Sequence, residues 1–144
     1  MKQTQMFFVL LTLACATAVA QAEPSGVLKS VKFNVNSDQL KPGSAAILDQ
    51  AVEAIKNQFP DARIELAGHS DESGKEEYNL GLSKRRAQAV RNYLVTHGIE
   101  ADRLLVKGYG ANRPVAGNEN ERGRSQNRRV EVRFAQEPGP GDFH

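Results

Sequence analysis

Short stretches in which apolar and polar residues alternate recur along the chain. This period of two is typical of half-buried β-strands. We therefore expect four strands, at 31–35, 63–68, 104–108 and 130–134.

Between these stretches the apolar residues recur every three or four positions, which predicts amphipathic helices. Leu48, Val52 and Ile55 mark one helix, and a second, longer helix covers 78–97. A short third helix fits the end of the polar stretch 111–127. The order of the elements predicts a two-layer α/β sandwich, in which a small mixed sheet carries the helices on one face.

The first 22 residues have the layout of a secretory signal peptide. Lys2 precedes an apolar run that ends in small residues at Ala20 and Ala22, and this run is short for a membrane span. Cleavage after Ala22 would place the mature protein in the periplasm. Two alternatives stay open: an uncleaved anchor helix, and lipidation at Cys15, whose neighbours match a lipoprotein signal poorly.

The predicted organisation has four parts. After the signal peptide, a short leader at 23–30 precedes one domain at 31–134, and the Pro- and Gly-rich end is expected to be an unordered tail at 135–144. Charge is nearly balanced, with 19 basic and 17 acidic residues, and cleavage would remove only the charge of Lys2. Such a balance argues against a general polyanion-binding protein.

The second helix carries an arginine on its apolar side. Leu82, Arg86, Val90 and Leu94 follow one another at intervals of four, so Arg86 should point toward the core. A buried charge needs a partner. Arg86 could have a structural role, either reaching the edge of the core or pairing with an internal acid. Alternatively, Arg86 and Asp71 of the preceding loop could together bind a zwitterion, the arginine holding its carboxylate.

Three motifs carry a resemblance to a known family. The stretches "GHSDESG", "YNLGLSKRRAQAV" and "GRSQNRRVEV", in this order, resemble the OmpA C-terminal-like, peptidoglycan-binding domain family over about residues 31–134. The resemblance implies the same two-layer fold. It also implies that Asp71 and Arg86 hold the diaminopimelate residue of the peptidoglycan stem peptide.

The resemblance implies further binding residues as well. Asn79 matches the family's asparagine, and Arg128 matches an arginine that lines the same pocket. Ser70 replaces the usual threonine and keeps a hydroxyl group. Asn34 and Asn36 stand where many relatives have aspartate, so they bring hydrogen-bonding capacity without charge.

The predicted function is non-catalytic binding to the cell wall through the stem peptide. The alternative is an adaptor, periplasmic or lipid-anchored, whose main role is to bridge outer membrane and wall through protein partners of the envelope. No cofactor is expected.

An enzyme is a competing interpretation. His69, Asp71 and Glu72 form a cluster that could act in acid–base chemistry or metal binding, but no metal-ligand spacing such as H-E-x-x-H and no G-x-S-x-G motif is present. We therefore interpret His69 as a hydrogen-bonding turn residue and expect no catalysis.

A nucleic-acid-binding module is the other competing interpretation. Five arginines lie between residues 122 and 133 against the single acid Glu131, and such a patch could contact phosphates. No set of stacking aromatic residues accompanies it, and the export signal would remove the chain from nucleic acid. No nucleic-acid partner is expected.

Overall fold

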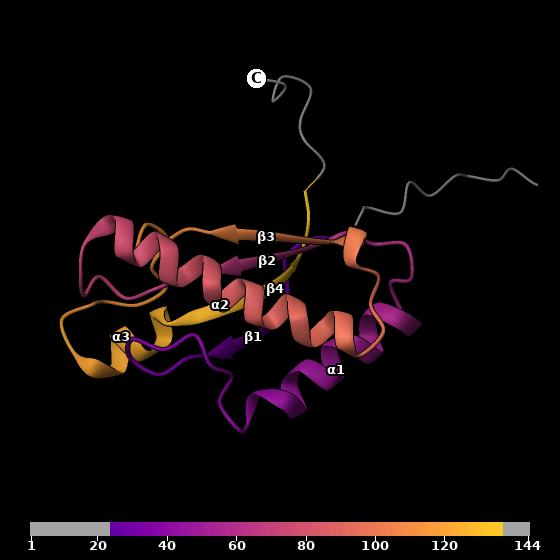
Figure 1. The fold of residues 1–144 in the computed structure, drawn as a ribbon, viewed down its shortest axis with the longest axis horizontal. Coiled ribbons are helices and arrows are strands. Elements are labelled where there is room, and N and C mark those ends of the chain that lie inside the picture. The colour runs from indigo at the N-terminus through magenta and orange to yellow at the C-terminus, as the bar shows by residue number, and fades with distance from the viewer. Residues whose placement is uncertain (1–23, 137–144) are drawn as a thin grey trace, which may run out of the picture.

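A computed structural model describes residues 24–136 and shows one four-stranded sheet (Figure 1). The predicted signal peptide and most of the predicted tail lie outside these residues. The strands are β1 (Val27–Lys32), β2 (Ile64–Gly68), β3 (Leu104–Gly108) and β4 (Arg129–Phe134). The helices are α1 (Ser44–Asn57), α2 (Glu76–Thr96) and α3 (Glu121–Asn127), with a 3₁₀ turn at Ala101–Arg103.

The sheet is mixed, as predicted. Its strand order is β1-β4-β2-β3; β4 pairs antiparallel with both β1 and β2, whereas β2 and β3 are parallel. In Figure 1, α2 crosses in front of the strands and α1 lies next to β1. Leu48 and Ile55 of α1 share one core with Val90 and Leu94 of α2. The predicted α/β sandwich, with its helices on one face of the sheet, is therefore confirmed.

The first strand lies earlier than predicted. It spans Val27–Lys32, so most of it falls in the segment expected to be a leader, and Val35 is 60% exposed. The partner strand sets this limit, because Lys32 pairs with Arg129, the first residue of β4. Beyond Lys32 only the amide of Phe33 continues the pairing, by donating to the carbonyl of Arg128.

Two glycines let α2 lie close against the sheet. A Cβ atom at Gly68 would lie 1.9 Å from the backbone oxygen of Ser83, and one at Gly108 would lie 2.8 Å from the Ser83 hydroxyl. Neither position can hold a side chain without moving the helix. This close contact sets the depth at which the inward side chains of α2 enter the domain.

We expect Gly68→Ala to destabilise the fold, because the new methyl group would collide with the backbone of α2. Overpacking of this kind costs about 1–3 kcal/mol, and the rigid neighbour favours the upper end. Urea unfolding would measure the loss. Gly43→Ala is the matched control, since a Cβ there meets nothing within 4 Å. Equal stability of the two variants would contradict the close packing of α2.

Candidate functional site

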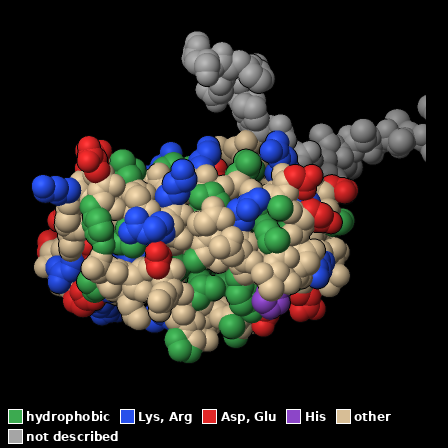
Figure 2. Space-filling model, viewed as in Figure 1, with side chains coloured by type: hydrophobic (Ala, Val, Ile, Leu, Met, Phe, Trp, Pro, Cys, Tyr) green, Lys and Arg blue, Asp and Glu red, His purple; other side chains and the backbone are tan. Residues whose placement is uncertain are grey.

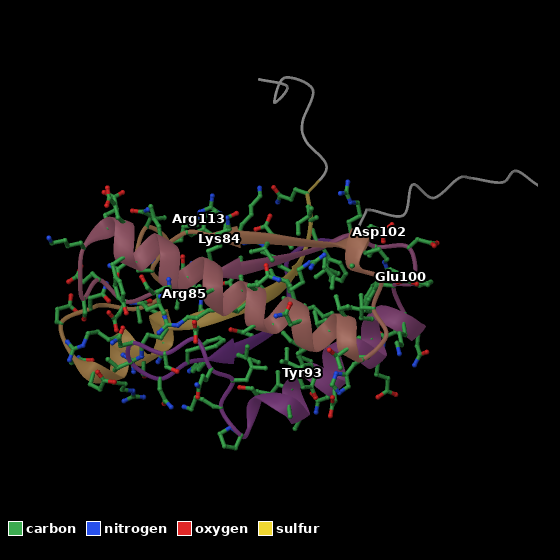
Figure 3. All side chains as sticks on the ribbon, viewed as in Figure 1. Lys84, Arg85, Tyr93, Glu100, Asp102 and Arg113 are labelled. Atoms are coloured by element: carbon green, nitrogen blue, oxygen red, sulfur yellow. The ribbon has the colours of Figure 1, made fainter. Side chains whose placement is uncertain are left out.

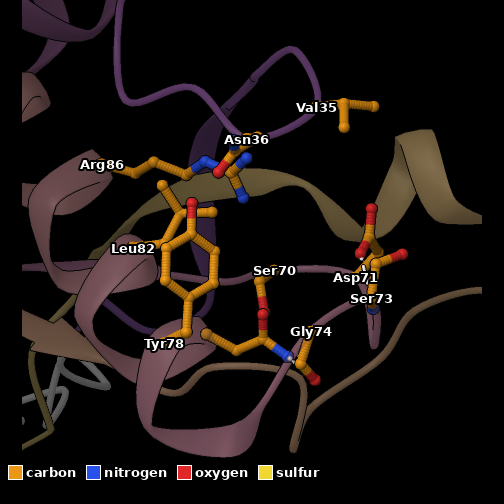
Figure 4. Close-up of a pocket in the computed structure, with 10 residues that line it drawn as sticks. Val35, Asn36, Ser70, Asp71, Ser73, Gly74, Tyr78, Leu82 and Arg86 are labelled. Atoms are coloured by element: carbon orange, nitrogen blue, oxygen red, sulfur yellow. Dashed lines mark hydrogen bonds between the residues drawn. The ribbon is translucent and has the colours of Figure 1, made fainter.

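A cavity of about 380 Å³ lies between the start of α2, the loop after β2 and the loop after β1 (Figure 4). Both charged residues that sequence analysis paired, Asp71 and Arg86, line it, and so do Ser70 and Asn79. The other lining residues are Val35, Asn36, Ser73, Gly74, Tyr78 and Leu82.

Arg86 is completely buried and bonds only to backbone carbonyls among the described residues. Its Nε donates to Ser37 at 2.8 Å, and its two terminal nitrogens donate to His69 and Asn34 at 3.0 Å each. Both structural roles considered from the sequence are therefore wrong: Arg86 does not reach the surface and does not pair with an internal acid. A guanidinium has five N–H groups, so two of those of Arg86 take no part in these three bonds.

Arg86 remains charged although it is buried. Burial lowers its pKa to about 10, against an opposing contribution from Asp71, so the guanidinium stays protonated at neutral pH. The neighbouring Arg85 differs completely: its side chain is half exposed, bonds to Asp38 and points outward from α2 (Figure 3). Arg91, also on α2, donates to the carbonyls of Ala101 and Leu104.

Asp71 pairs with Arg128 and not with Arg86. Its Oδ2 lies 3.0 Å from Nη1 of Arg128, and its Oδ1 accepts a hydrogen bond of 2.8 Å from the backbone of Ser73. Burial alone would raise the pKa of Asp71, but the Ser73 amide and the Arg128 guanidinium outweigh that effect and hold the pKa below its ordinary value. Asp71 is therefore ionised at neutral pH.

Arg128 is not among the residues that line the cavity. It is 5% exposed, and besides Asp71 it binds the carboxylate of Glu121 at 2.6 Å and the carbonyl of Phe33 at 3.2 Å. The structure thus places the arginine that the resemblance assigned to the pocket wall in contact with the aspartate of that wall.

The smaller polar residues differ in how they meet the cavity. Asn79 is almost fully buried and makes one long bond, 3.4 Å from Nδ2 to the carbonyl of Gly74. Ser70 is also buried, and its hydroxyl has no hydrogen-bond partner among the described residues. The side chain of Asn34 does not line the cavity; only its carbonyl takes part, through Arg86. Asn36 lines the cavity instead, with a positive φ of 53°.

Sequence reasoning missed the exposed apolar rim. Tyr78 and Val35 are 44% and 60% exposed, although both border the cavity. In the sequence, only their neighbours could have indicated a place near the cavity: Tyr78 directly precedes Asn79, and Val35 lies between two asparagines. Position on a helix or loop does not reveal that an exposed side chain borders a cavity.

His69 makes its hydrogen bonds through its backbone alone. The ring is 1% exposed and stacks on Tyr109 at 5.4 Å, and neither ring nitrogen has a partner among the described residues. His69 is thus a hydrogen-bonding residue directly after β2, as interpreted from the sequence, but its backbone and not its ring makes the bonds. Burial, helped by the charge of Arg129, lowers its pKa to about 4, so the ring is neutral at physiological pH.

Comparison with known proteins identifies the domain. The model of the OmpA family matches residues 32–128. The chain belongs to the OmpA family. It is 42% identical over 101 residues to the peptidoglycan-associated lipoprotein of Pseudomonas aeruginosa, covering 70% of this chain and 59% of that protein. It is also 42% identical over 102 residues to outer membrane porin F of Pseudomonas fluorescens, covering 71% of this chain and 31% of the porin.

Solved structures show the same fold. The peptidoglycan-associated lipoprotein of Burkholderia pseudomallei superimposes with a TM-score of 0.70 at 33% identity, covering 74% of this chain and 90% of that one. The C-terminal domain of Helicobacter pylori MotB gives 0.70 at 23% identity, covering 76% and 86%, which supports the fold alone. The chain thus spans less than two thirds of the full length of the first curated relatives, but nearly all of the B. pseudomallei structure.

Residues 24–136 contain neither a candidate metal site nor a candidate membrane-spanning helix. No group of three or more His, Cys, Asp or Glu side chains is placed to hold a metal ion. Within the same range, no helix combines the length and apolar character needed to cross a membrane. On the face shown in Figure 2, basic and acidic side chains are interspersed over the surface.

The buried charge of Arg86 provides a test of its structural role. We expect Arg86→Lys to destabilise the domain by roughly 2–3 kcal/mol, because one ammonium cannot reach three carbonyls and leaves buried acceptors unsatisfied. Chemical denaturation would measure the difference. Arg85→Lys, one residue earlier and exposed, should unfold like the parent; a parent-like Arg86→Lys would show that the carbonyl bonds contribute little.

His69 predicts a pH dependence of stability. Its folded pKa of about 4 lies below the ordinary value of 6.5, so the unfolded chain binds the proton more readily and stability falls as the pH drops from 6.5 toward 4. The expected loss between pH 7.5 and pH 5 is about 2 kcal/mol. Urea unfolding at the two pH values would measure it.

Two variants test whether His69 causes this pH dependence of stability. His69→Phe keeps an aromatic ring on Tyr109 and should remove most of the loss between pH 7.5 and pH 5. His97→Gln, at the exposed end of α2, should keep it. If His69→Phe does not fold, NMR titration of the parent decides, because a His69 ring titrating near 6.5 would contradict the prediction.

Proposed function

We propose that this domain binds peptidoglycan without catalysis, through the diaminopimelate residue of the stem peptide. One observation carries the proposal: Asp71 and Arg86 line the same cavity with opposite charges, yet they do not neutralise each other by direct pairing. Each is held by other partners, so a ligand with adjacent ammonium and carboxylate groups would find both charges in place.

The hydrogen-bonding capacity of the site fits this ligand. The unlinked end of diaminopimelate carries one ammonium and one carboxylate on the same carbon. The two remaining N–H groups of Arg86 suit the carboxylate, since guanidinium binds carboxylate through paired bonds. Each oxygen of Asp71 accepts one bond from the protein and keeps a lone pair for the ammonium.

The uncharged residues would complete the contact. The buried Ser70 hydroxyl has no partner among the described residues, and a ligand would supply one. Asn79 and Asn36 line the same cavity and offer amide groups, whereas Asn34 would act only by fixing Arg86 through its carbonyl. Tyr78, Val35 and Leu82 would contact the methylene chain of the ligand.

The relatives support the class of ligand. Two of the proteins similar to this chain are named peptidoglycan-associated lipoproteins, and others are named outer membrane proteins. These names support a location in the cell envelope, and we propose that the mature protein lies in the periplasm after signal-peptide cleavage. The outer-membrane names also favour a second role, in which the domain bridges wall and outer membrane through envelope partners.

Binding to purified sacculi tests the proposal. We expect the parent to co-sediment with diaminopimelate-containing sacculi and to be displaced by free meso-diaminopimelate but not by cadaverine, which keeps both ammonium groups and lacks both carboxylates. Asp71→Asn should weaken binding at least about tenfold, since a hydrogen bond to a charged group is worth ~1.5–3 kcal/mol.

The control is Glu72→Gln, which removes the same charge from the next, exposed residue outside the cavity wall. It should bind like the parent. Parent-like binding by a folded Asp71→Asn, or equal displacement by cadaverine, would refute the proposed ligand contact.

A further inference from the structure

Arg128 binds a second carboxylate in addition to that of Asp71. Nη1 of Arg128 binds Asp71 at 3.0 Å, while Nη2 binds Oε1 of Glu121 at 2.6 Å. Arg128 and Asp71 are buried, whereas the Glu121 side chain is 61% exposed. One guanidinium therefore lies between the acid of the cavity and an acid at the surface.

The charge of this group depends on Glu121. Asp71 and Arg128 alone would form a neutral pair, and an ammonium approaching Asp71 would meet the positive charge directly behind it. With Glu121 ionised, the three side chains carry one net negative charge. A net negative charge attracts an ammonium at short range, whereas a neutral pair does so only weakly.

The local fold holds Glu121 in this place. It is the first residue of α3, whose N-terminus is capped by the Asn120 side chain, which accepts from the amide of Gly123 at 2.9 Å. Asn127 at the other end of α3 binds the backbone of Val115 and Ala116. The bond to Arg128 also holds the pKa of Glu121 below its ordinary value, against an opposing effect of burial.

We propose that Glu121 is a specificity-determining residue for the ammonium group of the ligand, acting through Arg128 on Asp71. The inference rests on the proposed function and adds a residue that does not line the cavity. Its role is electrostatic: Glu121 offsets the charge of Arg128 and so leaves the charge of Asp71 available to the ligand.

Comparing the binding of two ligands distinguishes an electrostatic role of Glu121 from a structural one. Meso-diaminopimelate carries ammonium groups, and pimelate has the same seven-carbon dicarboxylate chain without them. Removing the negative charge of Glu121 should weaken the binding of the first ligand and leave the second unchanged or tighter. Damage to the cavity would weaken both.

The experiment is an NMR shift titration of the purified chain with each ligand at low salt. For Glu121→Gln we expect meso-diaminopimelate to bind about three- to fivefold more weakly, the range of an exposed ion pair, with the difference shrinking at high salt. Glu119→Gln is the control: it is also exposed, removes the same charge and forms no ion pair within residues 24–136. It should bind both ligands like the parent.

Each other outcome overturns the inference. If Glu121→Gln binds meso-diaminopimelate like the parent, Glu121 has no part in recognition, while the proposed function stands. Equal weakening for both ligands assigns Glu121 a structural role only. If the parent itself does not bind meso-diaminopimelate, both the proposed function and the role of Glu121 fail.

Discussion

The buried guanidinium of Arg86 is the constraint on which the rest of the site depends. A charge removed from water must be compensated, and here three backbone carbonyls do so in place of an acid. These carbonyls belong to the loop after β1 and to the end of β2, so a single side chain of α2 holds both segments. The cavity is formed by the same segments. The bonds of Arg86 therefore hold together two of the segments that form the cavity.

Asp71 and Arg86 each bond to other partners and not to one another. Asp71 is bound by Arg128 and by the amide of Ser73, and Arg86 is bound by carbonyls. If Asp71 and Arg86 had paired with each other, their hydrogen-bonding groups would have been used within the protein, and their opposite charges would largely have cancelled. The observed arrangement leaves opposite charges fixed on one cavity, which is the form of complementarity that a zwitterion needs.

Local patterns predicted the elements and the inward direction of Arg86, because both depend on spacing within a single helix or strand. They did not predict which partners these residues meet. Arg86 bonds to Asn34 across 52 positions, and Arg128 bonds to Asp71 across 57. The position of β1 was misjudged for a related reason: it pairs with β4 through its backbone, which demands little of its side chains, and Val27 and Lys29 break the expected alternation.

The extent of the family match agrees with the bonds that build the site. The match covers residues 32–128, and the polar contacts that hold Asp71 and Arg86 run from Phe33 to Arg128. Most of β1 precedes this segment, and β1 supports the sheet through its pairing with β4 and through Val31, which is fully buried in the core. A site whose bonds all lie within one domain can retain its geometry when that domain forms part of a longer protein. This explains how a chain with this domain can match less than a third of a porin and most of a lipoprotein structure.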